Sequence, residues 1–248
     1  RFIKLMNTWK VKIITAHPEF FPGPLEKSLI GKALDAKLWS LEIINLHEFS
    51  YNSRGSVDDS PFGGGPGMII RPDVLEKAIK KSMENMESNI PLVYMTPVGE
   101  PLVQKTLKNF SIGSGVIIIC GRFEGIDERV LNAYNIKKIS LGDFILSGGE
   151  VAAIAFLEGC IRLMPGVLGK EESLINESFN DGFLEHPQYT RPKNWIDDEG
   201  NEHKVPEVLL SGNHEKIIEW KKNQSIEITK KNRPDIIKKK LKESKNNE

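Results

Sequence analysis

Hydrophobic and polar positions follow two alternating patterns along the first two-thirds of the chain. Short apolar, β-branched runs predict buried strands at residues 11–16, 41–46, 91–95, 115–120 and 136–141. Between them, helices are predicted by apolar spacing and intervening length at 25–38, 72–86, 101–109, 127–134 and 150–164. Strands that alternate with helices predict an α/β fold whose mainly parallel sheet is covered on both faces.

The pattern changes in the last third of the chain. Residues 165–212 are rich in Gly, Pro, Asn and acidic residues and show no periodicity. A helical pattern returns at 211–224, where Ser211 or Asn213 is a candidate N-cap, and again at 233–244. We therefore expect four parts: an N-terminal extension (1–8), an α/β domain (9–168), an interdomain linker (169–190) and a small C-terminal helical domain (191–248).

Charge is distributed unevenly, although the net charge is zero. Residues 221–248 hold ten Lys or Arg and four acidic residues, a net charge of +6, so the remainder carries −6. Such asymmetry favours a basic appendage that meets a polyanion, but a solvated helical tail explains the same residues.

Several classes of protein are disfavoured by the sequence. It holds no apolar run of about 18 residues, which a membrane helix requires, and its first residues lack a signal-peptide pattern. The two cysteines and five histidines show no metal or redox spacing, so no metal site is predicted. We expect a cytoplasmic protein with no membrane partner.

A glycine cluster, "PFGGGPG" at 61–67, lies in a long polar stretch between two predicted elements. It lacks the Lys-Ser/Thr of a P-loop and the spacing of a dinucleotide-binding fingerprint. A phosphate cradle is therefore disfavoured, and two interpretations remain: a flexible surface loop, or a lid over a ligand.

Three further glycine-containing segments, at 94–101, 120–130 and 140–150, lie at or just after the ends of predicted strands. Ligands of open α/β sheets bind outside the carboxyl ends of the strands, so these segments predict one pocket suited to adenine or ribose. Each segment alone also fits an ordinary tight β–α connection. In the third, Asp143 is placed to accept a hydrogen bond or to steady a cation.

Four charged residues are candidates for chemistry. Glu124 could accept from the N–H edge of guanine, although internal ion pairing also explains the charges around it. Arg162 interrupts an apolar helical face, where a structural salt bridge is the alternative. Glu177 and Asp181 lie in the linker, from which a mobile carboxylate could reach a substrate.

Seven motifs, taken together and in order, resemble those of the bacterial tRNA (guanine-N1)-methyltransferase family. They are "SVDDSPFGGGPGM", "CGRFEGIDERV", "LGDFILSGGE", "MPGVLG", "HPQYTRP", "VPEVLLSGNH" and "W…QS…RPD", and they span about Trp9 to Asp235. The resemblance implies a SPOUT fold with a deep trefoil knot, a homodimer, and methylation of the guanine 3′ of the anticodon, tRNA position 37.

The resemblance also implies a set of site residues. S-adenosylmethionine would be bound by Tyr94, Thr96, Pro97, Gly121, Phe123, Gly125, Ser140, Leu141, Gly142, Asp143, Phe144, Ile145, Leu146, Gly148 and Gly149. The target guanine would lie near Gly63, Gly64, Gly65, Pro66, Gly67, Arg122, Glu124 and Asp181.

For catalysis, the resemblance implies an arginine, matched by Arg162, that stabilises charge on guanine O6, and a general base. The family's aspartate is replaced here by Glu177, one methylene longer, with Asp181 as a fallback. The family also implies a magnesium requirement, of which the sequence shows no independent sign. The alternatives are a non-catalytic RNA-binding protein of the same fold and a SPOUT enzyme that methylates ribose or another base.

Overall fold

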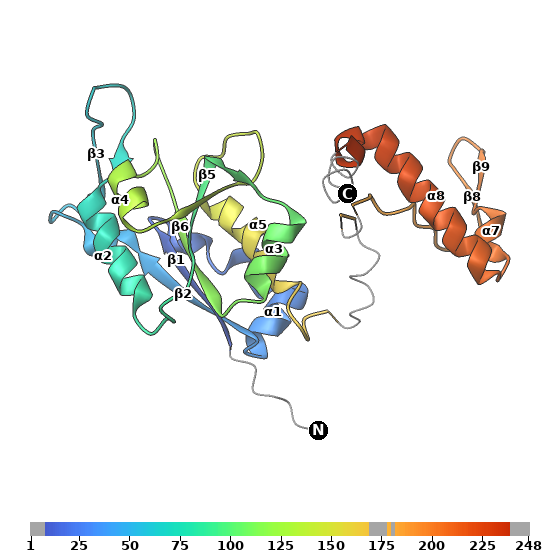
Figure 1. Cartoon of the computed structure of the whole chain (residues 1–248), viewed down its shortest axis with the longest axis horizontal. Helices are drawn as coiled ribbons and strands as arrows, with labels where there is room; N and C mark the ends of the chain where they lie inside the picture. The colour runs from blue at the N-terminus through green and yellow to red at the C-terminus, as the bar shows by residue number, and fades with distance from the viewer. Residues whose placement is uncertain (1–7, 169–177, 180–181, 239–248) are drawn as a thin grey trace, which may run out of the picture. The chain divides into compact units, whose positions relative to one another are not determined.

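The computed structural model describes residues 8–168, 178–179 and 182–238, and the chain divides into two compact units, 1–169 and 170–248. The first unit contains a five-stranded sheet in the order β2-β1-β6-β5-β7 (Figure 1). Its strands are β1 (Trp9–Thr15), β2 (Trp39–Asn45), β5 (Leu92–Pro101), β6 (Gly115–Cys120) and β7 (Lys137–Ser140). All four pairings between these strands are parallel, which confirms the predicted α/β class with a parallel sheet.

Both faces of the sheet are covered, because the central strand β6 is buried along its whole length. Val116 and Ile118 belong to a core cluster shared with α1 (Ser28–Asp35), α3 (Gln104–Ser111) and α5 (Glu150–Ile161). Ile117 and Ile119 point the other way, into a cluster with α2 (Pro72–Met83) and α4 (Glu128–Ala133). Figure 1 shows the two groups of helices on opposite sides of the sheet.

The observed boundaries differ from the predicted ones at several points. The helix predicted at 25–38 is a 3₁₀ turn (Gly23–Glu26) followed by the shorter α1, and two further 3₁₀ turns cover Pro18–Phe20 and Leu46–Phe49. Helix α5 ends at Ile161, and β5 continues to Pro101, past a register shift against β7. Helix α2 begins at Pro72, where the fixed φ of proline suits a first turn.

The glycine cluster lies between two short antiparallel strands, β3 (Asp58–Asp59) and β4 (Ile69–Ile70). Figure 1 shows the loop projecting beyond β3. The β3–β4 pair therefore closes the base of the predicted long polar connection, and its tip extends away from that pair.

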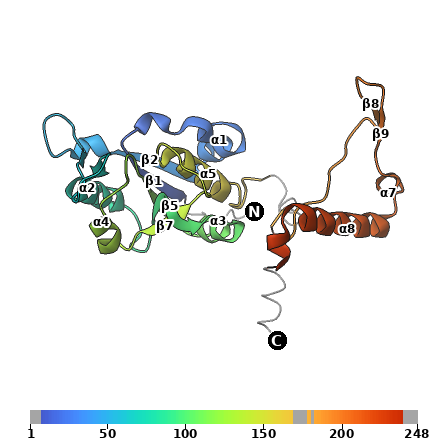
Figure 2. The same ribbon diagram turned by 90° about the horizontal axis from the view of Figure 1, so that it is seen from above.

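The second unit contains β8 (Asn194–Ile196), β9 (Glu202–Lys204), α7 (Glu207–Leu210) and the long helix α8 (His214–Asn232), with α7 at one end of α8 (Figure 2). Asn213 caps α8 by accepting from the Lys216 amide, which decides between the two candidate caps. The rings of His186 and Tyr189 pack against Trp220. The helix predicted at 233–244 lies partly outside the described residues.

The hairpin of β8 and β9 was not predicted, because it lies in residues 165–212, where the sequence shows no periodicity. All six strand residues are exposed, so no apolar alternation marks them in the sequence. The turn depends instead on Asp197, whose carboxylate accepts from the Glu199 and Asn201 amides. In the described part of the chain, no helix is long and apolar enough to cross a membrane.

Candidate functional site

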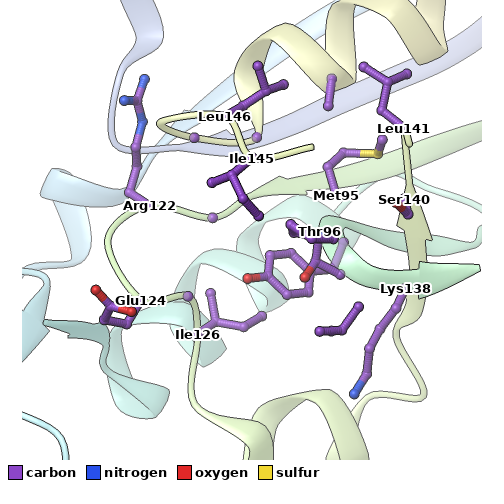
Figure 3. Close-up of a pocket in the computed structure, with 18 of the residues that line it drawn as sticks. Met95, Thr96, Arg122, Glu124, Ile126, Lys138, Ser140, Leu141, Ile145 and Leu146 are labelled. Carbon is purple, nitrogen blue, oxygen red and sulfur yellow. The ribbon is translucent and has the colours of Figure 1, made fainter. Parts of the chain in front are cut away.

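A cavity of about 450 Å³ lies beside the middle of β5 and at the carboxyl-terminal ends of the strands β6 and β7. This volume falls within the range of pockets that bind small molecules and cofactors. Three segments line the cavity: 94–98, 121–126 and most of 140–149. In Figure 3, Arg122 and Glu124 lie on one side, Ser140 and Lys138 on the other, and Ile145 and Thr96 between them.

The segment 94–98 supplies part of the cavity wall through Tyr94. This residue is 7% exposed, and burial raises the pKa of its phenol, which therefore stays neutral at pH 7. A Cβ on Gly121 would lie 2.7 Å from the Tyr94 ring, and one on Gly125 would lie 3.0 Å from its hydroxyl. Glycine at these two positions makes room for the tyrosine side chain.

The segments 121–125 and 146–149 are joined by their backbones. The Gly149 amide donates to the Gly121 carbonyl at 2.9 Å, and Arg122 and Gly148 form an antiparallel bridge. A Cβ on Gly149 would lie 2.9 Å from the Cys120 Cα, closer than real Cβ atoms approach backbone. The close contact between the two segments therefore requires glycine at position 149.

The third segment begins in a tight turn after β7. The Ser140 hydroxyl donates to the Gly142 carbonyl at 3.1 Å, and the Phe144 amide donates to the same carbonyl at 3.0 Å. Around the cavity rim, the side chains of Phe123, Phe144 and Ile145 are more than half exposed. Phe123 has a φ of 58°, a left-handed conformation that costs energy for a bulky residue and clusters at functional sites.

The charged residues of segment 120–130 divide into four groups, one of which is Glu128, paired with Lys138 at 3.0 Å. Asp127 caps α4 and pairs with Arg129, whose guanidinium lowers the pKa of the Asp127 carboxyl, so part of the segment is internally paired as one interpretation predicted. Arg122 pairs with Glu150 instead, at 2.9 Å. Within the described part of the chain no ion pair involves Glu124, whose side chain lines the cavity and lies against Gly67.

The cavity brings together nearly all the residues assigned to donor binding. Of that set, each residue except Asp143 lines the cavity, and Arg122 and Glu124 line it as well. Other lining residues were not predicted: Met95, Val98, Ile126, Glu128, Leu131, Lys138, Ser147 and Ala152. Most of them lie within or beside the three segments, so proximity to a strand end is the signal that could have found them.

The glycine loop is connected to the cavity through its base. The Ile70 amide donates to the Gly125 carbonyl at 3.0 Å, and the Glu124 amide donates to the Met68 carbonyl at 2.9 Å. Farther out, Gly63, Gly64 and Gly65 have positive φ, and a Cβ on any of them would meet open space. The base is thus fixed beside Glu124, while the tip has no neighbours at these glycines.

Of the residues assigned to catalysis, only Arg162 lies in the described part of the chain. Arg162 is the half-buried C-cap of α5, and Ala152, near the start of α5, lines the cavity. Ten residues of helix separate the two positions by about 15 Å along its axis. Glu177 and Asp181 lie outside the described residues.

No preformed metal centre occurs in the described ranges. They contain no group of three His, Cys, Asp or Glu residues that could hold an ion. Both cysteines are buried, and burial raises the pKa of the Cys120 thiol well above its usual range.

The comparisons with known proteins agree with this geometry. The family model of tRNA (Guanine-1)-methyltransferase TrmD matches residues 9–239. A tRNA (guanine-N(1)-)-methyltransferase of Ruegeria pomeroyi is 48% identical over 94% of this chain and 94% of its own length. Those of Pelagibacter ubique and Wolbachia pipientis wMel are each 48% identical over 92% of this chain, covering 96% and 95% of their own lengths. The chain therefore belongs to the tRNA (guanine-1)-methyltransferase TrmD family.

Proposed function

We propose that the protein transfers a methyl group from S-adenosylmethionine to N1 of the guanine at tRNA position 37. The observation that carries the proposal is the cavity itself. Fourteen of the fifteen residues assigned to the donor come from three separate segments and line one space of about 450 Å³. Family membership supplies the reaction class.

The residues of the cavity fit an adenosine-containing ligand. The backbone of segment 140–149 offers amide and carbonyl groups for an adenine edge, and Tyr94, Leu141 and Ile126 offer apolar surface for its faces. S-adenosylmethionine would supply a methyl group already activated on a positively charged sulfur. The protein then has to position the two substrates and manage one proton.

The proton is the one on guanine N1, which must leave as the N1–methyl bond forms and the carbon–sulfur bond breaks. We assign its removal to Glu177, the carboxylate that stands where the family carries aspartate. Arg162 would stabilise the negative charge that develops on O6, and Glu124 would accept a hydrogen bond from the N–H edge of the base. Asp181 is the alternative base.

We propose further that the site is shared by two subunits of a homodimer. Arg162 lies about 15 Å along α5 from Ala152, the residue of that helix that lines the cavity, so another chain's Arg162 is the better candidate to reach the guanine. The exposed apolar rim formed by Phe123, Phe144 and Ile145 supports an interface beside the cavity. An isologous dimer would then contain two such sites.

Other parts of the proposal rest on the family alone. We propose that the three cavity segments form a deep trefoil knot, that the C-terminal helical domain binds tRNA, and that the protein acts in the cytoplasm. The boundaries of these domains remain those predicted from the sequence. Magnesium is likewise expected from the family alone, and no step is assigned to it.

Mass spectrometry of a tRNA transcript with guanine at positions 36 and 37 tests the reaction. Incubation with protein and S-adenosylmethionine should add one methyl group, located at N1 of guanine 37. Glu177→Gln should abolish transfer and retain donor binding, and Glu177→Asp should retain much of the activity. A methyl group on ribose or another base, or none at all, would contradict the proposal, and a fully active Gln variant would redirect attention to Asp181.

Mixed dimers test the shared site. Gly142→Trp should fill the donor cavity of one chain, and Glu177→Ala should remove the base from the other. Each homodimer should be inactive, whereas the doubly tagged heterodimer should regain at most about one working site. Heterodimers that are folded by circular dichroism and still inactive would mean that each chain builds its own site.

A further inference from the structure

A buried ion pair lies behind the cavity and connects three segments of the chain. The Arg122 Nη2 atom lies 2.9 Å from Glu150 Oε2, and the two side chains are 14% and 1% exposed. The other carboxylate oxygen of Glu150 accepts from the Thr15 hydroxyl at 2.8 Å, and that hydroxyl accepts from the His17 amide at 2.9 Å. Glu150 in α5 thus contacts both the end of β1 and the loop that follows β6.

The pairing is held by charge more than by aligned hydrogen bonds. Arg122 Nε and Glu150 Oε2 are buried without a hydrogen-bond partner among the described residues. The guanidinium also lies over the Phe20 ring, 5.3 Å from its centroid. Breaking a buried pair by removing one partner leaves an uncompensated charge, so each member of the pair depends on the other.

Gly148 gives the pair its space. A Cβ at this position would collide with Arg122 Nε and with Glu150 Oε2. Gly148 has no unusual φ, so the requirement for glycine is steric. In Figure 3 the Arg122 side chain is directed away from Thr96 and Ile126, which agrees with a partner behind the cavity.

Removal of Glu150 would change the charge next to the cavity. Arg122 itself lines the cavity wall, and its guanidinium is neutralised only by Glu150 among the described ion pairs. An uncompensated guanidinium would add one positive charge beside a ligand that is itself cationic at sulfur. Like charges repel strongly where little water separates them.

We propose that Arg122 and Glu150 are positioning residues that hold the 121–125 loop against α5 and keep the cavity wall neutral for a cationic donor. The inference rests on the proposed function, because it takes S-adenosylmethionine as the ligand. It also gives Arg122 a different role from the expected contact with guanine: the guanidinium acts on the donor side, through Glu150.

Calorimetry with two ligands separates this role from a merely structural one. S-adenosylhomocysteine has the same adenosine and amino acid parts as the donor but no charge at sulfur. Glu150→Gln keeps the shape of the side chain and can still accept from Thr15. It should lower the affinity for S-adenosylmethionine by about tenfold more than the affinity for S-adenosylhomocysteine. If the ratio of the affinities for the two ligands stayed at its parental value, whether or not both fell, the proposal would be overturned.

Two further variants act as controls for the charge. Arg122→Met combined with Glu150→Gln removes both charges and should return the ratio of the two affinities to its parental value. Glu42→Gln leaves Lys12, which is 7% exposed and 2.9 Å from Glu42, without its carboxylate at a position outside the cavity lining. Glu42→Gln should leave the ratio of the two affinities unchanged. A shifted ratio in this variant would mean that the assay reports general destabilisation.

Gly148→Ala gives an independent measurement if Glu150→Gln does not fold. The added methyl group should displace the Arg122 guanidinium from Glu150. The affinity for S-adenosylmethionine should then fall more than the affinity for S-adenosylhomocysteine. Adding Arg122→Met should restore the ratio, and a Gly148→Ala protein with the parental ratio would overturn the proposal. A parent protein that bound neither ligand would contradict the proposed function itself.

Discussion

Two sets of glycines lie within one unit of this protein, and they serve opposite physical purposes. At the cavity, Gly121, Gly148 and Gly149 have no positive φ, and a Cβ on any of them would collide with neighbouring atoms. In the loop, Gly63, Gly64 and Gly65 have φ of 92°, 77° and 120°, and a Cβ on any of them would meet nothing within 4 Å.

The comparison shows that a glycine cluster does not by itself identify a binding surface. The cavity glycines make room for buried side chains at Gly121 and Gly148 and for neighbouring backbone at Gly149, so they build a site that is already shaped. The loop glycines allow the backbone to turn, so they leave a segment that can adapt. The cavity is therefore already shaped, whereas packing does not fix the conformation of the loop tip at these glycines.

The largest effect is expected for Gly149→Ala. Its Cβ would lie 2.9 Å from the Cys120 Cα and 3.1 Å from the Gly121 nitrogen, and backbone cannot yield as a flexible side chain can. We expect a loss of about 1–3 kcal/mol in the free energy of unfolding, measured in urea, with donor affinity at least about tenfold lower by calorimetry.

Gly113→Ala is the matched control for that variant. Gly113 lies between α3 and β6, and its Cβ would make an ordinary 3.4 Å contact with the Phe110 carbonyl. It should retain parental stability and donor affinity. A Gly149→Ala protein that behaves like the control would show that the cavity segments are not closely packed.

An intermediate effect is expected for Gly67→Ala, because Gly67 shares features of both sets. It has a φ of 87°, and a Cβ would collide with the Glu124 side chain. The left-handed backbone should cost about 1–2 kcal/mol of stability. Displacement of Glu124 should lower kcat/KM for tRNA and leave donor affinity within about twofold of the parent. An equal loss in both measurements would place Glu124 on the donor side.

The smallest effect is expected for Gly64→Ala. Its φ of 77° disfavours alanine, but the surrounding space allows the loop to relax, so unfolding should become easier by no more than about 1 kcal/mol. Gly64→Asn should be milder still, because asparagine tolerates the left-handed region. Equally large losses for both variants in urea denaturation would mean that the loop tip packs against something after all.

Prediction from the sequence succeeded where burial is regular. The strands β1 and β6 are largely apolar because both of their faces are covered, and this pattern can be read without any structure. The family resemblance, carried by long motifs, was confirmed by the comparisons. The hairpin of β8 and β9 was missed because its exposed strands leave no apolar pattern in the sequence.

The sequence by itself determined the α/β class, the family and the three segments that line the cavity, because each of these is indicated by a short continuous run of residues. Only the tertiary structure decided that Arg122 pairs with Glu150 and that α5 meets the cavity at Ala152, about 15 Å of helix before Arg162. Both facts depend on which parts of the chain meet in space. Residues 15, 122 and 150 have no relation in the sequence, and the contact between them arises only when parallel strands bring their ends to one edge of the sheet.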